Sequence, residues 1–305
     1  MKIAIIGSGA MGTLFAGLLS KSANDIYLLT KNKKAEKTIK KNGIKISGIT
    51  KITISHSNPK LKITSNPIEI SQPDLIIIFV KSYDTVFAVA SIKKMMCKNT
   101  TVLTIQNGLG NYEILSKFLN KKRIISGTTS ESSTFIKQGK VIHTGSGETI
   151  IEKSGKNISK QIADIFNACG IKTILSDKII SVKWSKLVLN CAINPVAAIS
   201  NVKNGEIIKR KNLFETAVES GKEVVLVAKK LKIKILFDDV AKKIEEICSA
   251  TSENTNSMLA DILSKKKTEI DFLNGTVVNI AKKLKIPVPV NKSLFEIIKK
   301  YDYRD

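Results

Sequence analysis

The stretch KIAIIGSGAMGTLFAGLL, residues 2–19, carries the strongest fold signal in the chain. An Ile-rich run comes first, then glycines in the pattern G-x-G-x-x-G, then an apolar run of helical character. In dinucleotide-binding folds such glycines permit a tight turn, backbone approach to a pyrophosphate and close packing of the helix on the sheet. The alternative is that they serve only a turn. We expect the loop to bind a dinucleotide through Gly7, Ser8, Gly9, Ala10, Met11 and Gly12.

The first half of the chain alternates short Ile- and Val-rich runs with longer stretches of helical period, which is typical of βαβ units around a parallel sheet. Strands are predicted at residues 2–6, 26–30, 75–80, 102–105 and 124–127, with a β-rich insertion at 44–54 and short strands at 141–144, 149–152 and 172–175.

From about residue 178 the sequence changes to long segments of 3.6-residue period, at 214–231, 240–263 and 269–284. We therefore expect two domains. Residues 1–177 would form an α/β Rossmann-type domain that binds the cofactor. Residues 178–305 would form an all-α helical domain that brings substrate and catalytic groups.

The net charge of +24 raises the question of a nucleic-acid partner. All but three of the 50 basic residues are lysine, they are spread along the chain, and no aromatic residues alternate with them. Nucleic-acid readers usually favour the arginine fork, so solvated surface lysines are the better interpretation and no nucleic-acid partner is expected.

Membrane and metal sites are also not expected. The longest aliphatic-aromatic run, residues 75–80, is too short to span a bilayer, and the N-terminus resembles a strand more than a signal peptide. The four cysteines form no CxxC pair, and only His56 and His143 could assist them, so no zinc cluster is predicted. We expect a cytoplasmic protein without membrane contact, and a proton donor other than histidine.

The end of the second predicted strand bears on the choice of dinucleotide. NAD-binding folds usually place an acid there to hold the ribose 2′-hydroxyl, whereas this chain has Thr30 and Lys31. A missing carboxylate beside cations favours NADP(H). The alternative is that Lys31, Lys33 and Lys34 are ordinary surface lysines.

Lys81 and Asn107 follow two other predicted strands, and ligands of such sheets bind beyond the carboxyl ends of the strands. Gly108 and Gly110 allow the loop after Asn107 to bend tightly. Each residue could belong to a simple turn, but together they indicate one wall of a cofactor site.

A polar stripe runs through the apolar stretch KWSKLVLNCAINPVAAIS, residues 183–200. Lys186, Asn190 and Asn194 recur every fourth residue, which places them along one face of a helix. The stripe is a candidate catalytic face. The alternative is a lysine that reaches solvent from a helix edge and asparagines that cap or bridge helices. Pro195 indicates a break or kink.

A second polar cluster lies in TSENTNSMLADILSKKKTEIDFLNG, residues 251–275. Asn254, Ser257 and Asp261 share a face at i, i+3 and i+7 if the segment is one helix. Thr268 resembles an N-cap, so Glu269 would begin the next helix. Glu269 could be a functional carboxylate or only a first-turn acid that the helix dipole favours.

Five motifs together resemble the 2-dehydropantoate 2-reductases, also called ketopantoate reductases. They are GSGAMG, QNGLGN, KWSKLVLNCAINPVAAI, ENTNSMLADI and KTEIDFLNG, and they follow one another in the family's order over essentially the whole chain. The resemblance implies NADPH-dependent reduction of ketopantoate to pantoate on the route to pantothenate and coenzyme A. It also implies catalysis in a cleft between a Rossmann-type domain and a helical domain.

The same resemblance implies roles for individual residues. Lys186 corresponds to the general acid, and Glu269 to a glutamate that binds substrate, supports the lysine and reaches the cofactor. Lys31 stands where relatives often have an arginine for the 2′-phosphate, which keeps the charge but loses the fork. Lys81 and Asn107 match positions on the cofactor side. The implied substrate ligands are Asn107, Asn190, Asn194, Asn254 and Ser257.

Other functions remain open at this point. The same fold could reduce a different small 2-oxo acid, because pocket shape is not legible in the sequence. An NADPH-binding regulator without catalysis is a further alternative, although Lys186 and Glu269 argue against it. We expect a monomer or a homodimer.

Overall fold

The structure is a computed structural model that describes residues 1–55, 57–154 and 157–302. His56 therefore lies outside the described residues. The chain divides into two compact units. An α/β unit comprises Met1–Gln106 and Asn111–Ile179, and a helical unit comprises Asn107–Gly110 and the chain from Ile180 onward.

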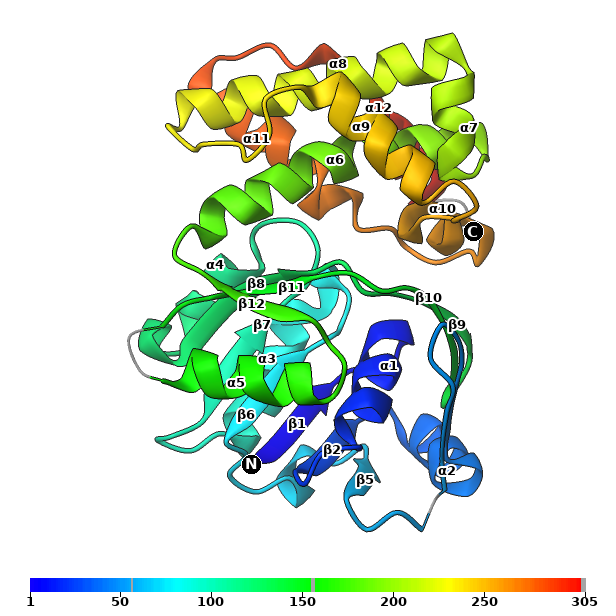
Figure 1. The fold of residues 1–305 in the computed structure, drawn as a ribbon. Coiled ribbons are helices and arrows are strands. Elements are labelled where there is room, and N and C mark those ends of the chain that lie inside the picture. The colour runs from blue at the N-terminus through cyan, green and yellow to red at the C-terminus, as the bar shows by residue number, and fades with distance from the viewer. Residues whose placement is uncertain (56, 155–156, 303–305) are drawn as a thin grey trace. The chain divides into compact units, whose positions relative to one another are not determined.

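An eight-stranded sheet forms the centre of the α/β unit (Figure 1). Its strands from β8 to β5 are all parallel, whereas β11 runs antiparallel to β8. In spatial order the strands are β12 (Thr173–Ser176), β11 (Thr149–Glu152), β8 (Ile124–Thr129), β7 (Thr101–Thr104), β6 (Leu75–Ile78), β1 (Lys2–Ile6), β2 (Asp25–Leu29) and β5 (Leu61–Thr64).

Alternate residues of each central strand supply two separate cores, because successive side chains point to opposite faces of a sheet. Ile3 and Ile5 of β1 pack with helices α1 (Ala10–Leu19) and α5 (Ile158–Ala168). Ala4 and Ile6 pack with helices α3 (Thr85–Met95) and α4 (Asn111–Phe118) on the other face. Both faces are covered, which explains the continuous apolar letters of these strands.

A smaller sheet packs against α1 on the same side as the first core. A Cβ on Gly17 of α1 would lie 2.3 Å from Cδ1 of Ile46, so the glycine leaves room for the isoleucine side chain between the helix and this sheet. The strands are, in spatial order, β4 (Ile52–Ile54), β3 (Ile44–Gly48), β10 (Lys140–Gly145) and β9 (Ser132–Lys137). The unit also contains α2 (Lys33–Asn42), η1 (Pro67–Glu69), η2 (Ser82–Asp84) and η3 (Lys121–Arg123).

Helix α6 (Ile179–Ser200) is the central helix of the helical unit (Figure 1). Trp184 and Val188 pack in one core, and Ala192 and Val196 pack in another. Packing in two cores explains the many apolar letters of α6. The other elements are α7 (Asn204–Lys209), α8 (Lys211–Lys230), α9 (Val240–Ala250), α10 (Ser257–Leu263), η4 (Ile270–Phe272), α11 (Asn274–Leu284) and α12 (Pro289–Asp302).

The expected fold class, a Rossmann-type α/β domain followed by helices, is confirmed, but several local predictions are wrong. The single helix predicted at 240–263 is two helices, α9 and α10. Asn256 separates them because its Oδ1 caps α10, accepting hydrogen bonds from the N–H groups of Met258 and Leu259 at 3.1 and 3.0 Å. Asn254 therefore precedes the helix, and only Ser257 and Asp261 share its face.

The helix predicted at 269–284 is also divided. Glu269 flanks the short 3₁₀ turn η4, and α11 begins only at Asn274. Strands β5 and β9 were not predicted, because lysine and polar residues weaken their apolar pattern. The break suggested by Pro195 is not found, because helix α6 continues through Pro195 and ends at Ser200.

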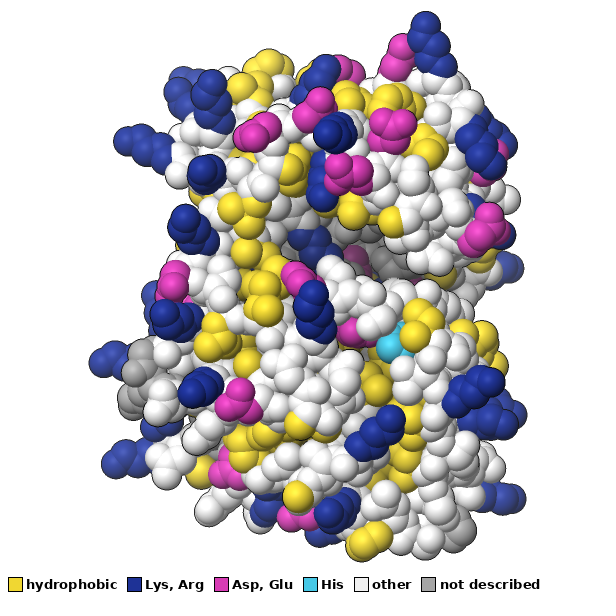
Figure 2. Space-filling view, viewed as in Figure 1, with side chains coloured by type: hydrophobic (Ala, Val, Ile, Leu, Met, Phe, Trp, Pro, Cys, Tyr) yellow, Lys and Arg dark blue, Asp and Glu magenta, His cyan; other side chains and the backbone are white. Residues whose placement is uncertain are grey.

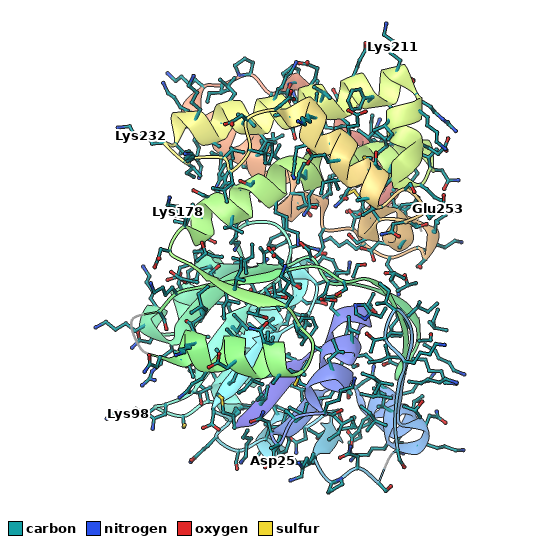
Figure 3. The ribbon with its side chains drawn as sticks, in the orientation of Figure 1. Asp25, Lys98, Lys178, Lys211, Lys232 and Glu253 are labelled. Atoms are coloured by element: carbon teal, nitrogen blue, oxygen red, sulfur yellow. The ribbon has the colours of Figure 1, made fainter. Side chains whose placement is uncertain are left out.

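Charged side chains are distributed over the surface. Lysine and arginine are scattered over the face shown in Figure 2, and the labelled Lys98, Lys211 and Lys232 point outward in Figure 3. Among the described residues, no helix is long and apolar enough to cross a membrane, and no group of three or more His, Cys, Asp or Glu side chains could hold a metal ion.

Candidate active site

The three loop glycines differ in what the fold demands of them. Gly7 has φ +106°, and a Cβ there would lie 3.0 Å from the carbonyl of Phe79. A Cβ on Gly12 would lie 1.8 Å from the oxygen of Gly7. A Cβ on Gly9, the N-cap of α1, would meet no heavy atom within 4 Å. The fold thus requires Gly7 and Gly12, whereas it does not require glycine at position 9, which borders open space at the helix N-terminus.

The end of β2 presents cations and no available carboxylate. Lys31 is exposed, and Asn32 caps α2 by accepting a hydrogen bond from the N–H of Ala35 at 2.9 Å. The nearest acid in this segment, Glu36, accepts hydrogen bonds from Lys40 Nζ and Ser65 Oγ, both at 2.6 Å. These hydrogen bonds, that of Lys40 first, lower the pKa of Glu36 to about 2. Its two oxygens are therefore occupied.

A buried polar network joins the loops that follow β6 and β7. Gln106 Nε2 donates to the carbonyl of Val80 at 2.8 Å and to Thr85 Oγ1 at 3.0 Å. Asn111 Nδ2 donates to Ser82 Oγ at 3.1 Å, and Asn111 Oδ1 accepts from Thr85 Oγ1 at 2.9 Å. The network fixes the carboxyl ends of two neighbouring strands, where ligands of such sheets bind. Sequence reasoning missed these side chains, because nothing local distinguishes them from loop residues.

The predicted cofactor residues of the α/β unit follow the carboxyl ends of three adjacent strands of the sheet. The glycine loop follows β1, Lys31 follows β2, and Lys81 follows β6, and these three strands are neighbours with β1 in the middle. Lys81 is half-buried.

Asn107 belongs to a segment that packs within the helical unit. The N–H of Leu109 donates to the carbonyl of Phe272 at 3.0 Å. Gly108 has φ +75°, and a Cβ there would lie 2.3 Å from the oxygen of Phe272. Only glycine permits this approach, which connects the segment of Asn107 to η4, the turn that Glu269 flanks.

The polar stripe of α6 lies on one helix as predicted. Lys186 and Asn190 are half-buried, and Asn194 is only 8% exposed. Burial lowers the pKa of Lys186 to about 8, an effect that the carboxylate of Glu269 opposes and that the charge of Lys183 reinforces. Lys186 remains mainly an ammonium at neutral pH, and it releases its proton more readily than an ordinary lysine. That is the property of a general acid.

The second polar cluster is held by asparagines. Asn256 Nδ2 donates to Asn204 Oδ1 at 3.2 Å, and Asn204 Nδ2 donates to Thr251 Oγ1 at 3.0 Å. These bonds fix the loop between α9 and α10 on α7. Within it Asn254 is half-buried, and Ser257 is exposed at the start of α10.

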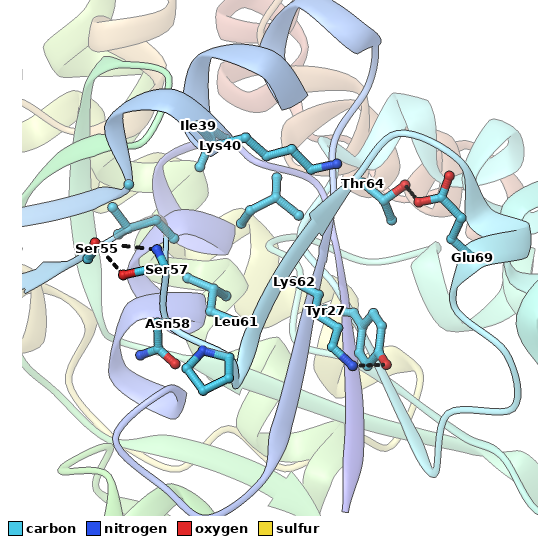
Figure 4. Close-up of a pocket in the computed structure, with 14 residues that line it drawn as sticks. Tyr27, Ile39, Lys40, Ser55, Ser57, Asn58, Leu61, Lys62, Thr64 and Glu69 are labelled. Carbon is cyan, nitrogen blue, oxygen red and sulfur yellow. Dashed lines mark hydrogen bonds between the residues drawn. The ribbon is translucent and has the colours of Figure 1, made fainter.

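A groove of about 840 Å³ lies elsewhere, between α2 and the edge strand β5 (Figure 4). Its lining includes Tyr27, Lys40 and Lys62, and Lys62 Nζ donates to the hydroxyl of Tyr27 at 3.1 Å. None of the predicted catalytic or cofactor residues lines this groove, so we do not assign it to the reaction.

Comparison with known proteins identifies the family of the chain. Residues 3–156 match the family model described as ketopantoate reductase PanE/ApbA, and residues 178–302 match its C-terminal counterpart. The chain belongs to the ketopantoate reductase family. The resemblance drawn from the sequence motifs is therefore confirmed, and the chain is an oxidoreductase.

Two ketopantoate reductases and a D-mandelate dehydrogenase are similar to the chain over nearly their whole length. The 2-dehydropantoate 2-reductase of Pyrococcus horikoshii is 37% identical over 98% of this chain and 97% of its own. A ketopantoate reductase structure from Ralstonia eutropha is 29% identical, with a TM-score of 0.90 and coverage of 99% and 98%. A D-mandelate dehydrogenase bound to NADH and anilino(oxo)acetate is 27% identical, with a TM-score of 0.91 and the same coverage.

Proposed function

We propose that the protein reduces ketopantoate to pantoate with NADPH, in the biosynthesis of pantothenate and coenzyme A. The observation that carries the proposal is a half-buried lysine and a half-buried carboxylate in the helical unit, Lys186 on α6 and Glu269 beside η4, which interact electrostatically. A regulator that only binds a dinucleotide has no need of such a proton donor. Family membership supports the substrate, because the curated relatives are 2-dehydropantoate 2-reductases.

We propose that residues 1–177 bind the cofactor and residues 178–305 carry out catalysis, except that residues 107–110 belong with the helical unit. The cofactor would be held by Gly7–Gly12, Lys31, Lys81 and Asn107, with Glu269 at its nicotinamide end. Gly9 supports this assignment, since its position leaves open space at the N-terminus of α1 where a pyrophosphate could approach. When bound, the cofactor supplies the hydride.

NADPH is the proposed form of the cofactor. A 2′-phosphate requires cations and no competing carboxylate at the end of β2. Lys31 is exposed there, the positive N-terminus of α2 begins two residues later, and both oxygens of Glu36 are occupied. The D-mandelate dehydrogenase with NADH shows that the other dinucleotide occurs on a closely similar fold, so the choice needs a direct test.

The residues of the helical unit divide the chemical work. The Lys186 ammonium polarises the ketone and gives its proton to the alkoxide oxygen that forms when hydride reaches the carbonyl carbon. Glu269 keeps the lysine charged and accepts a hydrogen bond from the substrate hydroxyl. Asn107, Asn190, Asn194, Asn254 and Ser257 are the proposed ligands of the substrate's carboxylate and hydroxyl groups.

One assay tests this function. Purified protein is mixed with NADPH and ketopantoate, and loss of the reduced-nicotinamide absorbance is followed. Benzoylformate, the 2-oxo acid that corresponds to mandelate, is run in parallel, and each reaction is repeated with NADH. We expect the highest kcat/KM for ketopantoate with NADPH. Preference for benzoylformate would identify a different 2-oxo acid reductase, and binding of NADPH without turnover of either acid would favour a regulator.

A further inference from the structure

Pro195 leaves one carbonyl of α6 without its helical partner. In a helix the oxygen of residue i accepts from the N–H of residue i+4, and proline has no N–H. The carbonyl of Cys191 is therefore deprived of the donor at position 195. Cys191 is 0% exposed, so water cannot take the place of that donor without entering the core.

Two side chains from other helices donate to this carbonyl. Asn274 Nδ2, from the start of α11, donates to the oxygen of Cys191 at 3.1 Å. Ser220 Oγ, from α8, donates to the same oxygen at 3.0 Å. Both residues are 0% exposed. The bond that the helix loses at Pro195 is thus replaced by two bonds to its neighbours.

A third residue holds both donors. Asn291 Oδ1 accepts from Asn274 Nδ2 at 2.9 Å, and it lies 3.3 Å from Ser220 Oγ, whose single proton is directed to Cys191 or shared between the two oxygens. Asn291 Nδ2 in turn donates to the carbonyl of Ser220 at 2.9 Å and to Glu223 Oε2 at 2.8 Å. Glu223 also accepts from the backbone N–H groups of Val290 and Asn291, at 2.9 and 2.8 Å, at the start of α12. The donors therefore have little freedom to turn away.

The hydrogen bond between Asn274 and Cys191 lies close in the chain to the proposed catalytic pair, Lys186 and Glu269. Cys191 follows Lys186 by five residues on α6, and Asn274 follows Glu269 by five residues across η4. The bond from Asn274 to Cys191 thus joins the helix that carries the lysine to the segment that carries the carboxylate. We propose that Ser220 and Asn274 are positioning residues, which hold Glu269 in register with Lys186 through the carbonyl that Pro195 frees. The inference deepens the proposed function and rests on it for the roles of that pair.

A double-mutant cycle tests the role of Pro195. We expect Asn274→Ala to lower the equilibrium constant for folding by roughly tenfold or more, because a buried carbonyl loses a donor. In a Pro195→Ala background the N–H of residue 195 can bond to the carbonyl of Cys191. There Asn274→Ala should lower the equilibrium constant for folding by a factor at least about five times smaller than in the original background. Denaturant unfolding measures both values. Equal losses in the two backgrounds would show that Asn274 does not serve the freed carbonyl, and would overturn the proposal.

A second measurement separates positioning from simple stabilisation, and it needs no substrate. The pH dependence of Lys186 acetylation by acetic anhydride, read by mass spectrometry of its peptide, reports the pKa of the lysine in the folded protein. If Ser220→Ala or Asn274→Ala lets Glu269 move away, that pKa falls, because the carboxylate raises it. An unchanged pKa, or a rise caused by water entering the site, contradicts positioning.

Controls keep the outcome interpretable. Thr216 lies one turn before Ser220 on α8, and its hydroxyl donates to the carbonyl of Asn212 on the same helix at 2.8 Å. Thr216→Val removes a hydroxyl of the same helix without touching α6, and should leave the pKa of Lys186 unchanged. Ser220→Ala removes only one of two donors, so it provides a folded variant if Asn274→Ala does not fold. Since neither measurement uses ketopantoate, failure of the turnover assay does not affect them.

Discussion

Lys186 and Glu269 interact electrostatically within the helical unit, and the carboxylate raises the pKa of a lysine that burial has lowered. Burial has the larger effect, which leaves the pKa at about 8. The apolar surroundings of α6 and one carboxylate therefore set the same property in opposite directions. Substitutions at neighbouring charged residues should therefore move the pKa of Lys186 either up or down.

Replacing Lys186 by alanine should lower kcat by roughly two orders of magnitude or more, because the reaction loses its proton donor and the cation that stabilises the alkoxide. Steady-state turnover with saturating NADPH measures the effect. Lys229→Ala, at the exposed end of α8, is the matched control and should retain full activity. A Lys186→Ala rate within a few-fold of the original would remove the residue from the mechanism.

The pH profile should respond in opposite directions to two neighbours of Lys186. Activity requires the ammonium, so kcat should fall as pH rises through the pKa of about 8. Glu269→Gln removes the charge that raises this pKa and should move the alkaline limb to lower pH. Lys183→Ala removes a charge that lowers it and should move the limb to higher pH. Shifts in the same direction would show that the limb belongs to another group.

Replacing Lys186 by an apolar residue should raise the free energy of unfolding while it abolishes catalysis. The pKa of Lys186 is lower in the folded chain than in the unfolded chain, so between about pH 8 and 10.5 the unfolded state binds more protons and stability rises with pH. Below pH 8 the charged lysine costs stability. Lys186→Met should therefore stabilise the fold at pH 7 by on the order of 1 kcal/mol, a value reduced because the side chain retains solvent contact. Denaturant unfolding at pH 7 is the measurement, and a loss of stability would contradict it.

The glycine loop offers a contrast between a folding role and a binding role. Gly9→Ala introduces a Cβ that meets nothing within 4 Å, so the thermal midpoint should change little while the Kd for NADPH rises. Gly12→Ala places a Cβ 1.8 Å from the oxygen of Gly7 and should lower the thermal midpoint markedly. Thermal unfolding and NADPH titration separate the two. Unaltered NADPH affinity in Gly9→Ala would remove the assigned reason for that glycine.

Lys31 should determine the preference for NADPH. Lys31→Ala should raise the KM for NADPH by roughly tenfold, the usual consequence of losing a charge-assisted hydrogen bond, and leave the KM for NADH nearly unchanged. Lys31→Arg restores a cation with a bidentate fork and should retain or strengthen the preference. Lys34→Ala is the control from the same exposed segment. Equal effects on both cofactors would place the 2′-phosphate elsewhere.

The sequence predicted those features of the fold that depend on local patterns. The strand, glycine loop and helix at the N-terminus are found with β1 at the expected residues, and the stripe of α6 lies on one helix as its spacing required. The break between α9 and α10 was missed, although residues 251–256, TSENTN, include no apolar residue and end in the asparagine that caps α10.

Long-range contacts could not be predicted from a single sequence. The donors to Cys191 come from α8 and α11, and the network of Gln106 and Asn111 joins loops that are distant in the chain. A buried asparagine and a surface asparagine have the same letter, and only packing distinguishes them. Pro195 did carry a local signal, because a proline within a helix always leaves a carbonyl that needs another donor.

The bond between Leu109 and Phe272 has a consequence for the modularity of the chain. The helical unit is discontinuous, because it includes four residues from the first half of the sequence. A fragment that starts at residue 178 would lack the N–H of Leu109 and expose the apolar surface that the Leu109 side chain covers. Gene fusions and domain exchanges between relatives should therefore transfer residues 107–110 together with the helices, and truncations that keep the helices should keep these residues too.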